Sequence, residues 1–348
     1  MATFLFVVPR FHTNLFFATR ALIAAGHRVE VAVAKIAGTE DHSHVTPVEI
    51  GHEPEDAALR SLVLQTRPDL VVVRGTSRLT RRTAAAGRRE GAGVLRYDQH
   101  PAIRTTSVGR RISNFLLRRP AHRITPVPGL DPTAARDPMA RYIPFPVAAL
   151  PLDGTVRSPD WPVRLLCIGK LAQRRKRQPA LIDALRNLAN PARSFRLTIV
   201  GSSAQGFADT DDAHYQAQIA AARELDWLDI REDVPFAEMP AIYASHDICV
   251  LPSSGEPLGS APLEGMAYGT IPVISISAGS AGLIEENVTG LRVDICRDGA
   301  LERALCRLIE DRTLRTHMSE AARRFAETEL SPARYVARME ALLPRRRR

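Results

Sequence analysis

Apolar runs rich in valine, isoleucine and leucine alternate along this chain with stretches that repeat at helical period. In the first half, apolar runs lie at 3–8, 28–33, 69–74 and 94–98, and helices are expected at 15–25, 54–65 and 78–90. In the second half, apolar runs lie at 163–169, 195–201, 247–252, 271–276 and 291–294. Strands that alternate with helices are typical of βα units around a parallel sheet. The sequence therefore predicts an α/β protein made of two similar halves.

A proline-rich segment separates the two halves. Residues 144–162 hold five prolines and show no helical period, as is typical of a linker between domains. The length of 348 residues fits two domains of about 150 residues each. We therefore expect a first domain at 1–147, a linker at 148–162, a second domain at 163–330, and a C-terminal helix with a basic tail at 331–348.

The chain is basic, with 47 Lys and Arg against 38 Asp and Glu and a formal charge of +9. This balance favours an anionic partner, such as nucleic acid, an acidic membrane face or a phosphorylated substrate. An aromatic content of 5% and the lack of a recognisable DNA or RNA module argue against nucleic acid. Four cysteines without CxxC pairing, and no export signal or membrane-spanning run, predict a cytoplasmic protein with reduced thiols.

The segment SGEPLGSAPLEGMAYGTIPV, at 254–273, places two carboxylates around the start of a helix. That helix is expected from Ala261 to Tyr268, with Ser260 as its N-cap and a glycine after its end. The free N–H groups of Gly259, Ser260 and Ala261 would face an anion. The glycine would also let a ligand approach the backbone closely.

The two carboxylates suit the two sugar-like ends of one ligand. Glu264, in the first helical turn, offers two acceptor oxygens to the hydroxyls of a ribose. Glu256, on the preceding loop, could do the same for a second sugar beyond a diphosphate, which is the layout of a nucleotide-sugar. The alternative is a first-turn glutamate that stabilises the helix dipole and a solvated loop glutamate.

Several motifs in order resemble the retaining GT-B glycosyltransferases of family 4. They are IGKLAQRRKR, LTIVG, DICVLPS, EPLGSAPLEGMAYGTIPVI and GLIEENVTGLRV, with only GHRVEV in the first half. The resemblance implies two Rossmann-like α/β domains that face each other across a cleft. The first domain would serve the acceptor and the second would bind a nucleotide-sugar.

The resemblance also assigns roles in the second domain. Glu264 would bind the ribose, Glu256 would contact the hydroxyls of the donor sugar, and the amides after Leu258 would hold phosphate and sugar. The family usually has Phe where this chain has Leu258, which leaves the identity of the sugar open.

A basic loop follows the apolar run at 163–169. The family has an Arg and, five residues later, a Lys at this place, which implies that Lys170 and either Arg175 or Lys176 stabilise the leaving diphosphate. Lysine lacks the bidentate fork of arginine, so contact through Lys170 would be more point-like. The alternative is a solvated basic loop.

Three residues of the first half are candidate site residues because they follow predicted strands. His100 follows the run at 94–98, where the family often carries a His that faces the donor sugar. His12 and Asn14 follow the first strand, where the family usually has a glycine pair near the acceptor and phosphates. PRFHTN departs from that pattern, so the role of this loop stays open.

A DxD triplet at Asp209 to Asp211 resembles the metal-binding motif of other glycosyltransferases. It follows QGFA instead of an apolar strand and precedes a helix expected from about Asp212. N-capping of that helix is therefore the favoured role. We expect neither a metal site nor a cofactor.

The resemblance implies transfer of a sugar from a nucleotide diphosphate to an acceptor hydroxyl with retention of configuration. Glu256, Lys170 and His100 would be the catalytic residues, and the acceptor is not specified by the sequence. One alternative is a nucleotide-sugar epimerase of the same architecture, and another is a nucleotide-binding protein without catalysis. A Rossmann dehydrogenase is disfavoured because no GxGxxG follows the first strand.

The segment GRRISNFLLRRP, at 109–120, has the profile of a helix that lies on an anionic membrane. Ile112, Phe115 and Leu116 would share one face, with arginines at both ends. This profile allows peripheral contact with the inner face of a membrane. The favoured alternative is an ordinary helix whose apolar face packs in the core, because the segment is short.

Overall fold

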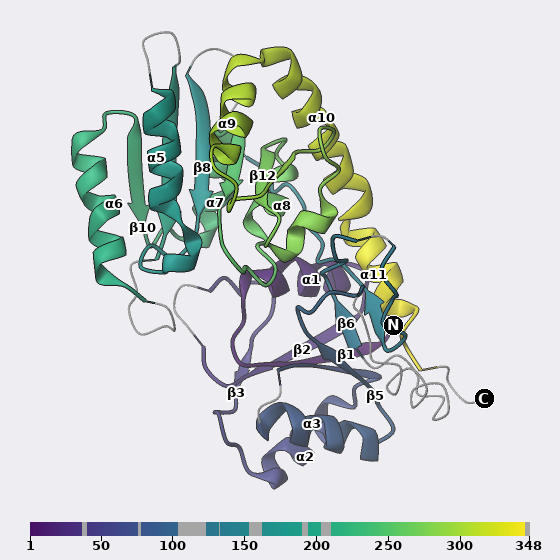
Figure 1. Cartoon of the computed structure of the whole chain (residues 1–348). Helices are drawn as coiled ribbons and strands as arrows, with labels where there is room; N and C mark the ends of the chain where they lie inside the picture. Colours follow the sequence, from purple (N-terminus) through teal and green to yellow (C-terminus); the bar gives the residue numbers. More distant parts are fainter. Residues whose placement is uncertain are drawn as a thin grey trace. The chain divides into compact units, whose positions relative to one another are not determined.

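The chain forms two compact units in a computed structural model (Figure 1). Unit 1 comprises Met1–Pro146 and Leu330–Arg348, and unit 2 comprises Val147–Glu329. The structure describes residues 1–36, 40–75, 78–103, 123–131, 133–152, 162–189, 194–202 and 210–344. The expected helix at 109–120 and the basic tail lie outside the described residues.

Unit 1 contains a seven-stranded sheet whose strands pair in parallel in the order β3-β2-β1-β4-β5-β6-β7. The strands are β1 Thr3–Val8, β2 Arg28–Val33, β3 Val48–Glu49, β4 Leu70–Arg74, β5 Gly93–Tyr97, β6 Arg123–Thr125 and β7 Ala140–Tyr142. The four long strands agree with the apolar runs of the sequence, whereas β3, β6 and β7 were not predicted. Runs of two or three residues are too short to show a period, so only pairing with a neighbour defines them.

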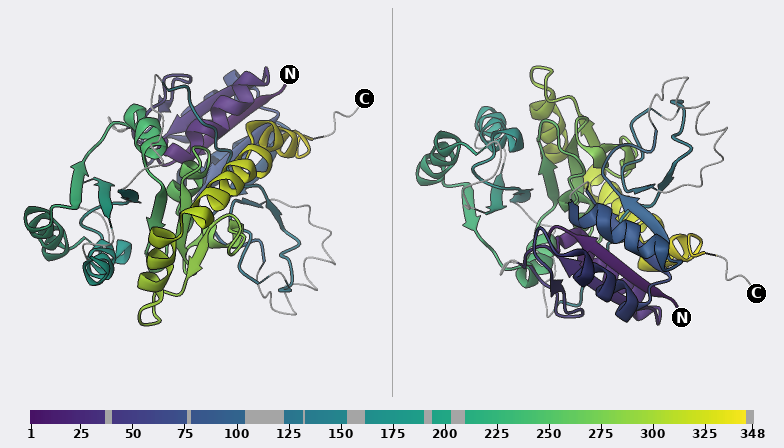
Figure 2. Two further views of the ribbon diagram at one scale, coloured as in Figure 1. Left: turned by 90° about the horizontal axis from the view of Figure 1, so that it is seen from above. Right: turned by 90° about the horizontal axis from the view of Figure 1, so that it is seen from below.

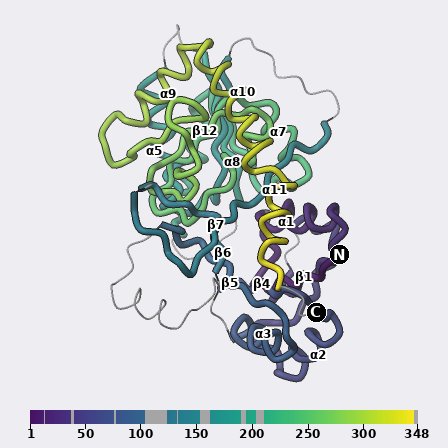
Figure 3. Tube along the Cα trace, turned by 90° about the vertical axis from the view of Figure 1, so that its right-hand side faces the viewer, coloured from purple at the N-terminus to yellow at the C-terminus, as the bar shows by residue number. Residues whose placement is uncertain are grey.

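Helices cover both faces of this sheet (Figure 1). They are α1 Thr13–Ala24, α2 Asp56–Thr66, α3 Arg78–Arg89 and α11 Pro332–Glu340. Alternate strand residues such as Leu5 and Val71 pack with Leu59 and Leu79 of α2 and α3. In Figure 3, α11 lies beside α1, away from α2 and α3. The last helix therefore completes unit 1, although it follows unit 2 in the sequence.

Unit 2 contains a six-stranded parallel sheet in the order β10-β9-β8-β11-β12-β13. The strands are β8 Val163–Ile168, β9 Phe195–Gly201, β10 Leu228–Glu232, β11 Ile248–Leu251, β12 Ile271–Ser275 and β13 Leu291–Val293. Only β10 was not expected, because its sequence LDIRE is largely polar. As an edge strand it needs little apolar side chain, which hides it from a pattern search.

The helices of unit 2 also lie on both faces of its sheet. They are α5 Gln178–Leu188, α6 Asp212–Glu224, α7 Met239–Ser245, α8 Ala261–Met266, α9 Ala300–Glu310 and α10 Arg312–Glu329, with 3₁₀ turns η1 Arg174–Lys176, η2 Phe236–Glu238 and η3 Gly279–Leu283. One core joins Leu165 and Leu197 to α5, α6 and α9, and a smaller cluster joins Leu166 to α7. In Figure 2, the teal helices α5 and α6 lie on one side of the strands.

These two parallel sheets confirm the predicted α/β class. In each sheet the first strand has a neighbour on both sides, β2 and β4 for β1, and β9 and β11 for β8. The strand order therefore reverses beside β1 and beside β8, and ligands of open α/β sheets bind at such points, outside the carboxyl ends of the strands. No helix in the described part of the chain is both long enough and apolar enough to span a membrane.

Candidate active site

The loops that follow β8 and β11 meet at the carboxyl ends of these neighbouring strands. The first loop turns through η1 and the second carries the predicted Glu256. The backbone N–H of Ser254 donates to the carbonyl of Arg175 at 2.7 Å, which ties the two loops together. Residues that are about 80 positions apart in the sequence are thus held side by side at the point where the strand order reverses.

Glu256 is the centre of an ion cluster between these loops. Its Oε2 accepts from Nη1 of Arg175 at 2.6 Å and from Nζ of Lys176 at 2.6 Å. The side chains of Glu256 and Lys176 are only 11% and 12% exposed, so solvent screens this attraction less than at an open surface. We name Arg175, Lys176 and Glu256 the Glu256 cluster.

Lys176 reaches Glu256 by crossing the end of β8. A Cβ on Gly169 would lie 3.1 Å from Cδ of Lys176, so the missing side chain leaves room for the lysine stem. The predicted Lys170 follows Gly169 directly and is partly exposed. Its carbonyl accepts from the side-chain amide of Gln178 at 3.2 Å, which fixes its backbone at the start of α5.

The loop that carries Glu256 is held by its backbone against η3. Gly279 N–H donates to the carbonyl of Glu256 at 3.0 Å, and Ser280 N–H donates to the carbonyl of Leu258 at 2.8 Å. The side chain of Leu258 is buried. Only the backbone of Leu258 therefore remains available to a ligand at the loop surface.

Gly259 has a packing role that the sequence analysis did not foresee. Its φ is +76°, in the left-handed region that favours glycine, and a Cβ would lie 2.4 Å from Cδ2 of Leu251. The same Cβ would lie 3.4 Å from Oγ of Ser280, a buried hydroxyl without a hydrogen-bond partner among the described residues. The backbone conformation and the packing against Leu251 therefore require glycine at position 259, with or without a ligand at the loop.

Glu264 lies in the first turn of α8 and is held by two hydroxyl groups. Tyr243 Oη donates to its Oε2 at 3.0 Å. Burial raises the pKa of Glu264, and hydrogen bonds from Ser260 and Tyr243 oppose that rise. The sequence offered no signal for Tyr243, because it lies on α7, 21 residues earlier.

The predicted capping role of Ser260 is wrong. Its backbone is helical, with φ −76° and ψ −26°, and its side chain makes no capping hydrogen bond. An N-cap residue normally has an extended backbone that aims its oxygen at the next N–H groups. The Ser260 hydroxyl instead supports Glu264, while Ala261 begins α8 as expected.

The other predicted site residues belong to unit 1. His12 precedes α1, where its carbonyl accepts from Leu15 N–H at 2.8 Å. The Asn14 side chain hydrogen-bonds Tyr97, whose pKa burial raises to about 12. His100 is exposed, and among the described residues it is bonded through its backbone, with its carbonyl accepting from Arg123 at 3.1 Å.

Arg123 organises the loop that carries His100, and the sequence analysis missed it. This arginine is buried and donates to Asp98 at 2.6 Å and to Asp137 at 2.9 Å. It also donates to the carbonyls of His100 and Pro101, both at 3.1 Å. A buried guanidinium with two carboxylates and two carbonyls fixes the chain after β5.

Asp211 is the N-cap of α6, as predicted. Its Oδ1 accepts from the backbone N–H of Ala213 at 2.9 Å and from that of His214 at 3.3 Å. Its other oxygen pairs with Arg174 at 2.9 Å. Asp209 lies outside the described residues. Within the described ranges, no group of three or more His, Cys, Asp or Glu side chains is placed to hold a metal ion.

The chain has two parallel α/β units and a charged site after β8 and β11. Its fold is that of the GT-B glycosyltransferases. Sucrose-phosphate synthase from Thermosynechococcus elongatus is similar over 98% of both chains, with a TM-score of 0.69 at 18% identity. Anabaena Alr3699/HepE, in complex with UDP-glucose, is similar over 99% of both chains, with a TM-score of 0.72 at 16% identity. At these identities the likeness establishes the fold alone.

Part of the sequence is similar to known glycosyltransferases. Residues 156–325, in unit 2, match the model of the family Glycosyl transferases group 1. The D-inositol 3-phosphate glycosyltransferase of Corynebacterium glutamicum (strain R) is 33% identical over 141 residues, which cover 40% of this chain and 33% of that protein. The chain thus spans about a third of the length of the curated relatives it matches.

Proposed function

We propose that this protein transfers a sugar from a nucleotide-diphosphate sugar to an acceptor hydroxyl with retention of configuration. The observation that carries the proposal is the Glu256 cluster, which joins two cations and a carboxylate at the carboxyl ends of β8 and β11. Glu264 follows on the next helix. Cations for a diphosphate therefore lie beside one carboxylate, the next helix carries a second, and each carboxylate can accept from a sugar.

Each residue then has a distinct task. Lys170, Arg175 and Lys176 stabilise the negative charge that grows on the departing diphosphate. Glu256 accepts from hydroxyls of the donor sugar, and Glu264 accepts from the ribose. Since the departing phosphate oxygen can itself take the acceptor proton on the same face, positioning and charge stabilisation are the main work of the protein.

The Glu256 cluster also explains how a basic loop is kept ready before the donor arrives. Two cations and one carboxylate give the Glu256 cluster a net positive charge, which attracts a diphosphate. Donor binding then replaces a contact of Glu256 with contacts to phosphate, and it releases the carboxylate toward the sugar. The match of residues 156–325 to a glycosyltransferase family and the fold shared with a UDP-glucose complex support this assignment.

The test is a panel of UDP-, GDP-, ADP- and dTDP-sugars, scored for release of nucleoside diphosphate with and without candidate acceptors. The Lys176→Ala variant is expected to lower turnover by about 10²–10³, the usual effect of removing one donor to a developing oxyanion. The matched control is Arg186→Ala, which removes an exposed cation paired with Asp183 on α5. The anomeric configuration of the product is read by NMR.

Three results would contradict the proposal. The first is a lack of diphosphate release with every donor, and the second is near-normal turnover of the folded Lys176→Ala variant. Inversion at the anomeric carbon would retain sugar transfer and reject the retaining mechanism. Treatment with a chelator followed by addition of a divalent ion tests the expected independence from metal.

A further inference from the structure

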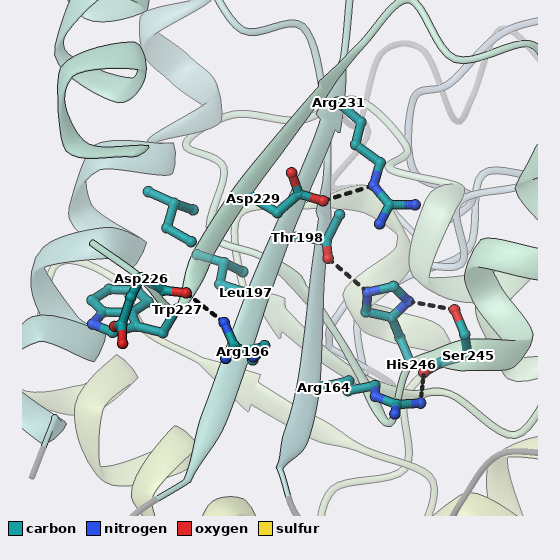
Figure 4. Close-up of a pocket in the computed structure, with 11 residues that line it drawn as sticks. Arg164, Arg196, Leu197, Thr198, Asp226, Trp227, Asp229, Arg231, Ser245 and His246 are labelled. Carbon is teal, nitrogen blue, oxygen red and sulfur yellow. Dashed lines mark hydrogen bonds and ion pairs between the residues drawn. The ribbon is translucent and has the colours of Figure 1, made fainter. Parts of the chain in front are cut away.

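A pocket of about 310 Å³ (Figure 4) lies at the end of the unit 2 sheet opposite the Glu256 cluster. It is formed where β8, β9 and β10 begin and where α7 ends. The proposed donor site uses the carboxyl ends of the strands, whereas this pocket lies at their amino ends. It is therefore a separate place on unit 2.

Two arginines on neighbouring strands line this pocket. Arg164 on β8 and Arg196 on β9 are partners in the parallel register, so their side chains leave the same face of the sheet. Like charges on neighbouring strands destabilise a sheet. An anion bound between the two arginines would offset this repulsion.

Neither guanidinium forms an ion pair with a carboxylate among the described residues, and the backbone N–H of Arg164 donates to the carboxylate of Asp247 at 2.8 Å. Arg164 donates to the backbone carbonyl of Ser245 at 3.4 Å, and Arg196 donates to the backbone carbonyl of Asp226. Figure 4 shows the two guanidinium groups turned toward these carbonyls, on either side of the pocket. Their positive charges therefore remain uncompensated by ion pairing.

The other charged groups of the pocket do not cancel this excess. Arg231 pairs with Asp229 at 2.7 Å, and these two side chains are about half exposed. Asp226 also lines the pocket and is exposed to solvent, as is Arg196, so solvent screens both of these charges. The lining side chains thus hold three arginines against two aspartates.

A buried histidine makes the back wall of the pocket rigid. His246 Nδ1 faces the carbonyl of Ile242 at 2.6 Å and therefore carries a proton there. Its Nε2 then accepts from the hydroxyl of Thr198 on β9 at 2.9 Å. These bonds fix the end of α7 to the sheet, so the pocket exists before any ligand binds.

We propose that this pocket binds a small phosphate-bearing molecule through Arg164 and Arg196. Phosphate presents several oxygens and up to two charges, which suits guanidinium groups from two adjacent strands. The volume lies at the lower end of the range for ligand sites and leaves room beyond one phosphate group. The binding is independent of sugar transfer and goes beyond the proposed function.

Trp227 supplies a local readout, because it lines the pocket. The chain has two tryptophans, so a Trp161→Phe background leaves Trp227 as the sole emitter. Inorganic phosphate is titrated at constant ionic strength, with chloride in the reference titration. We expect a saturable change in Trp227 emission with phosphate and none with chloride.

Arg164→Gln combined with Arg196→Gln is expected to weaken phosphate binding by about tenfold or more, the usual effect of losing a charge-assisted hydrogen bond. Arg186→Gln, an exposed arginine of α5, is the matched control and should bind like the parent. Lys176→Ala should also keep the signal, since it alters only the donor site. The single Arg196→Gln variant, at an exposed residue, decides the test if the double variant does not fold.

Titrations with glucose 6-phosphate and with glucose show whether the occupant is a phosphate ester or free phosphate. Tighter binding of glucose 6-phosphate than of inorganic phosphate supports a phosphate ester as the occupant, and equal binding supports free phosphate. Glucose binding as tight as that of glucose 6-phosphate would overturn the proposal. A flat phosphate titration, or unchanged affinity in the arginine variants, would do the same.

Discussion

Glu256 shows at the residue scale how one side chain can serve the protein and a ligand in turn. Its carboxylate neutralises part of the charge of Arg175 and Lys176, which would otherwise repel each other at the end of β8. Replacing one partner of such a partly buried group leaves an uncompensated charge, so the cluster is sensitive to change from either side.

Glu264 gives a prediction at the same scale. Burial raises its pKa above the ordinary 4.5, so the ionised form costs folding stability, and this cost grows as the pH rises through the raised pKa. The Glu264→Gln variant lacks this cost. Its free energy of unfolding, relative to the parent, is therefore expected to rise between about pH 4 and about pH 7.

Urea unfolding at both pH values measures this difference. Glu320→Gln is the control, because Glu320 is an exposed residue of α10 and should show little change with pH. A stability difference between parent and Glu264→Gln that is equal at both pH values would show that ionisation of Glu264 does not affect folding.

At the scale of the element, α6 depends on its cap. Asp211 satisfies two N–H groups at the helix start, and no other described side chain replaces it. Asp211→Ala is expected to lower the free energy of unfolding by about 1 kcal/mol. Urea unfolding provides the measurement. Asp212→Ala, which removes the neighbouring exposed carboxylate and leaves the cap, should cost less. Equal losses in the two variants would show that the cap geometry is unimportant.

At the scale of the whole molecule, the chain passes between the units twice, after Pro146 and after Glu329. The final helix α11 buries Tyr335 and Met339 in unit 1, and His27 of unit 1 contacts its Glu340 at 3.0 Å. The helix before it, α10, buries Met318 in the core of unit 2. Consecutive helices thus stabilise different units.

Two methionine variants test this division. Met339→Ala and Met318→Ala each remove a fully buried side chain and should each cost about 2–5 kcal/mol. Hydrogen exchange read by mass spectrometry should show faster exchange in α1 for Met339→Ala and in unit 2 for Met318→Ala. The same exchange pattern in both variants would contradict separate roles for the two helices.

Much of this protein could be predicted from local sequence pattern. Long apolar runs define β1, β2, β4 and most strands of unit 2, because buried strands of a parallel sheet need continuous apolar side chains. The segment at 254–273 likewise contains Glu256, Glu264 and the start of α8. The cap of α6 could be predicted from the sequence because a capping residue accepts from N–H groups only two or three positions away.

Tertiary structure decided whatever depends on distant parts of the chain. Arg175 and Lys176 reach Glu256 only because β8 and β11 are neighbours, and Tyr243 reaches Glu264 from another helix. The pairing of Arg164 with Arg196 likewise exists only through strand register. Local composition cannot encode such contacts, because their partners are chosen by sheet order and packing. The sequence alone therefore determined the α/β elements and the residues of the candidate site, and the folded chain decided which of them meet.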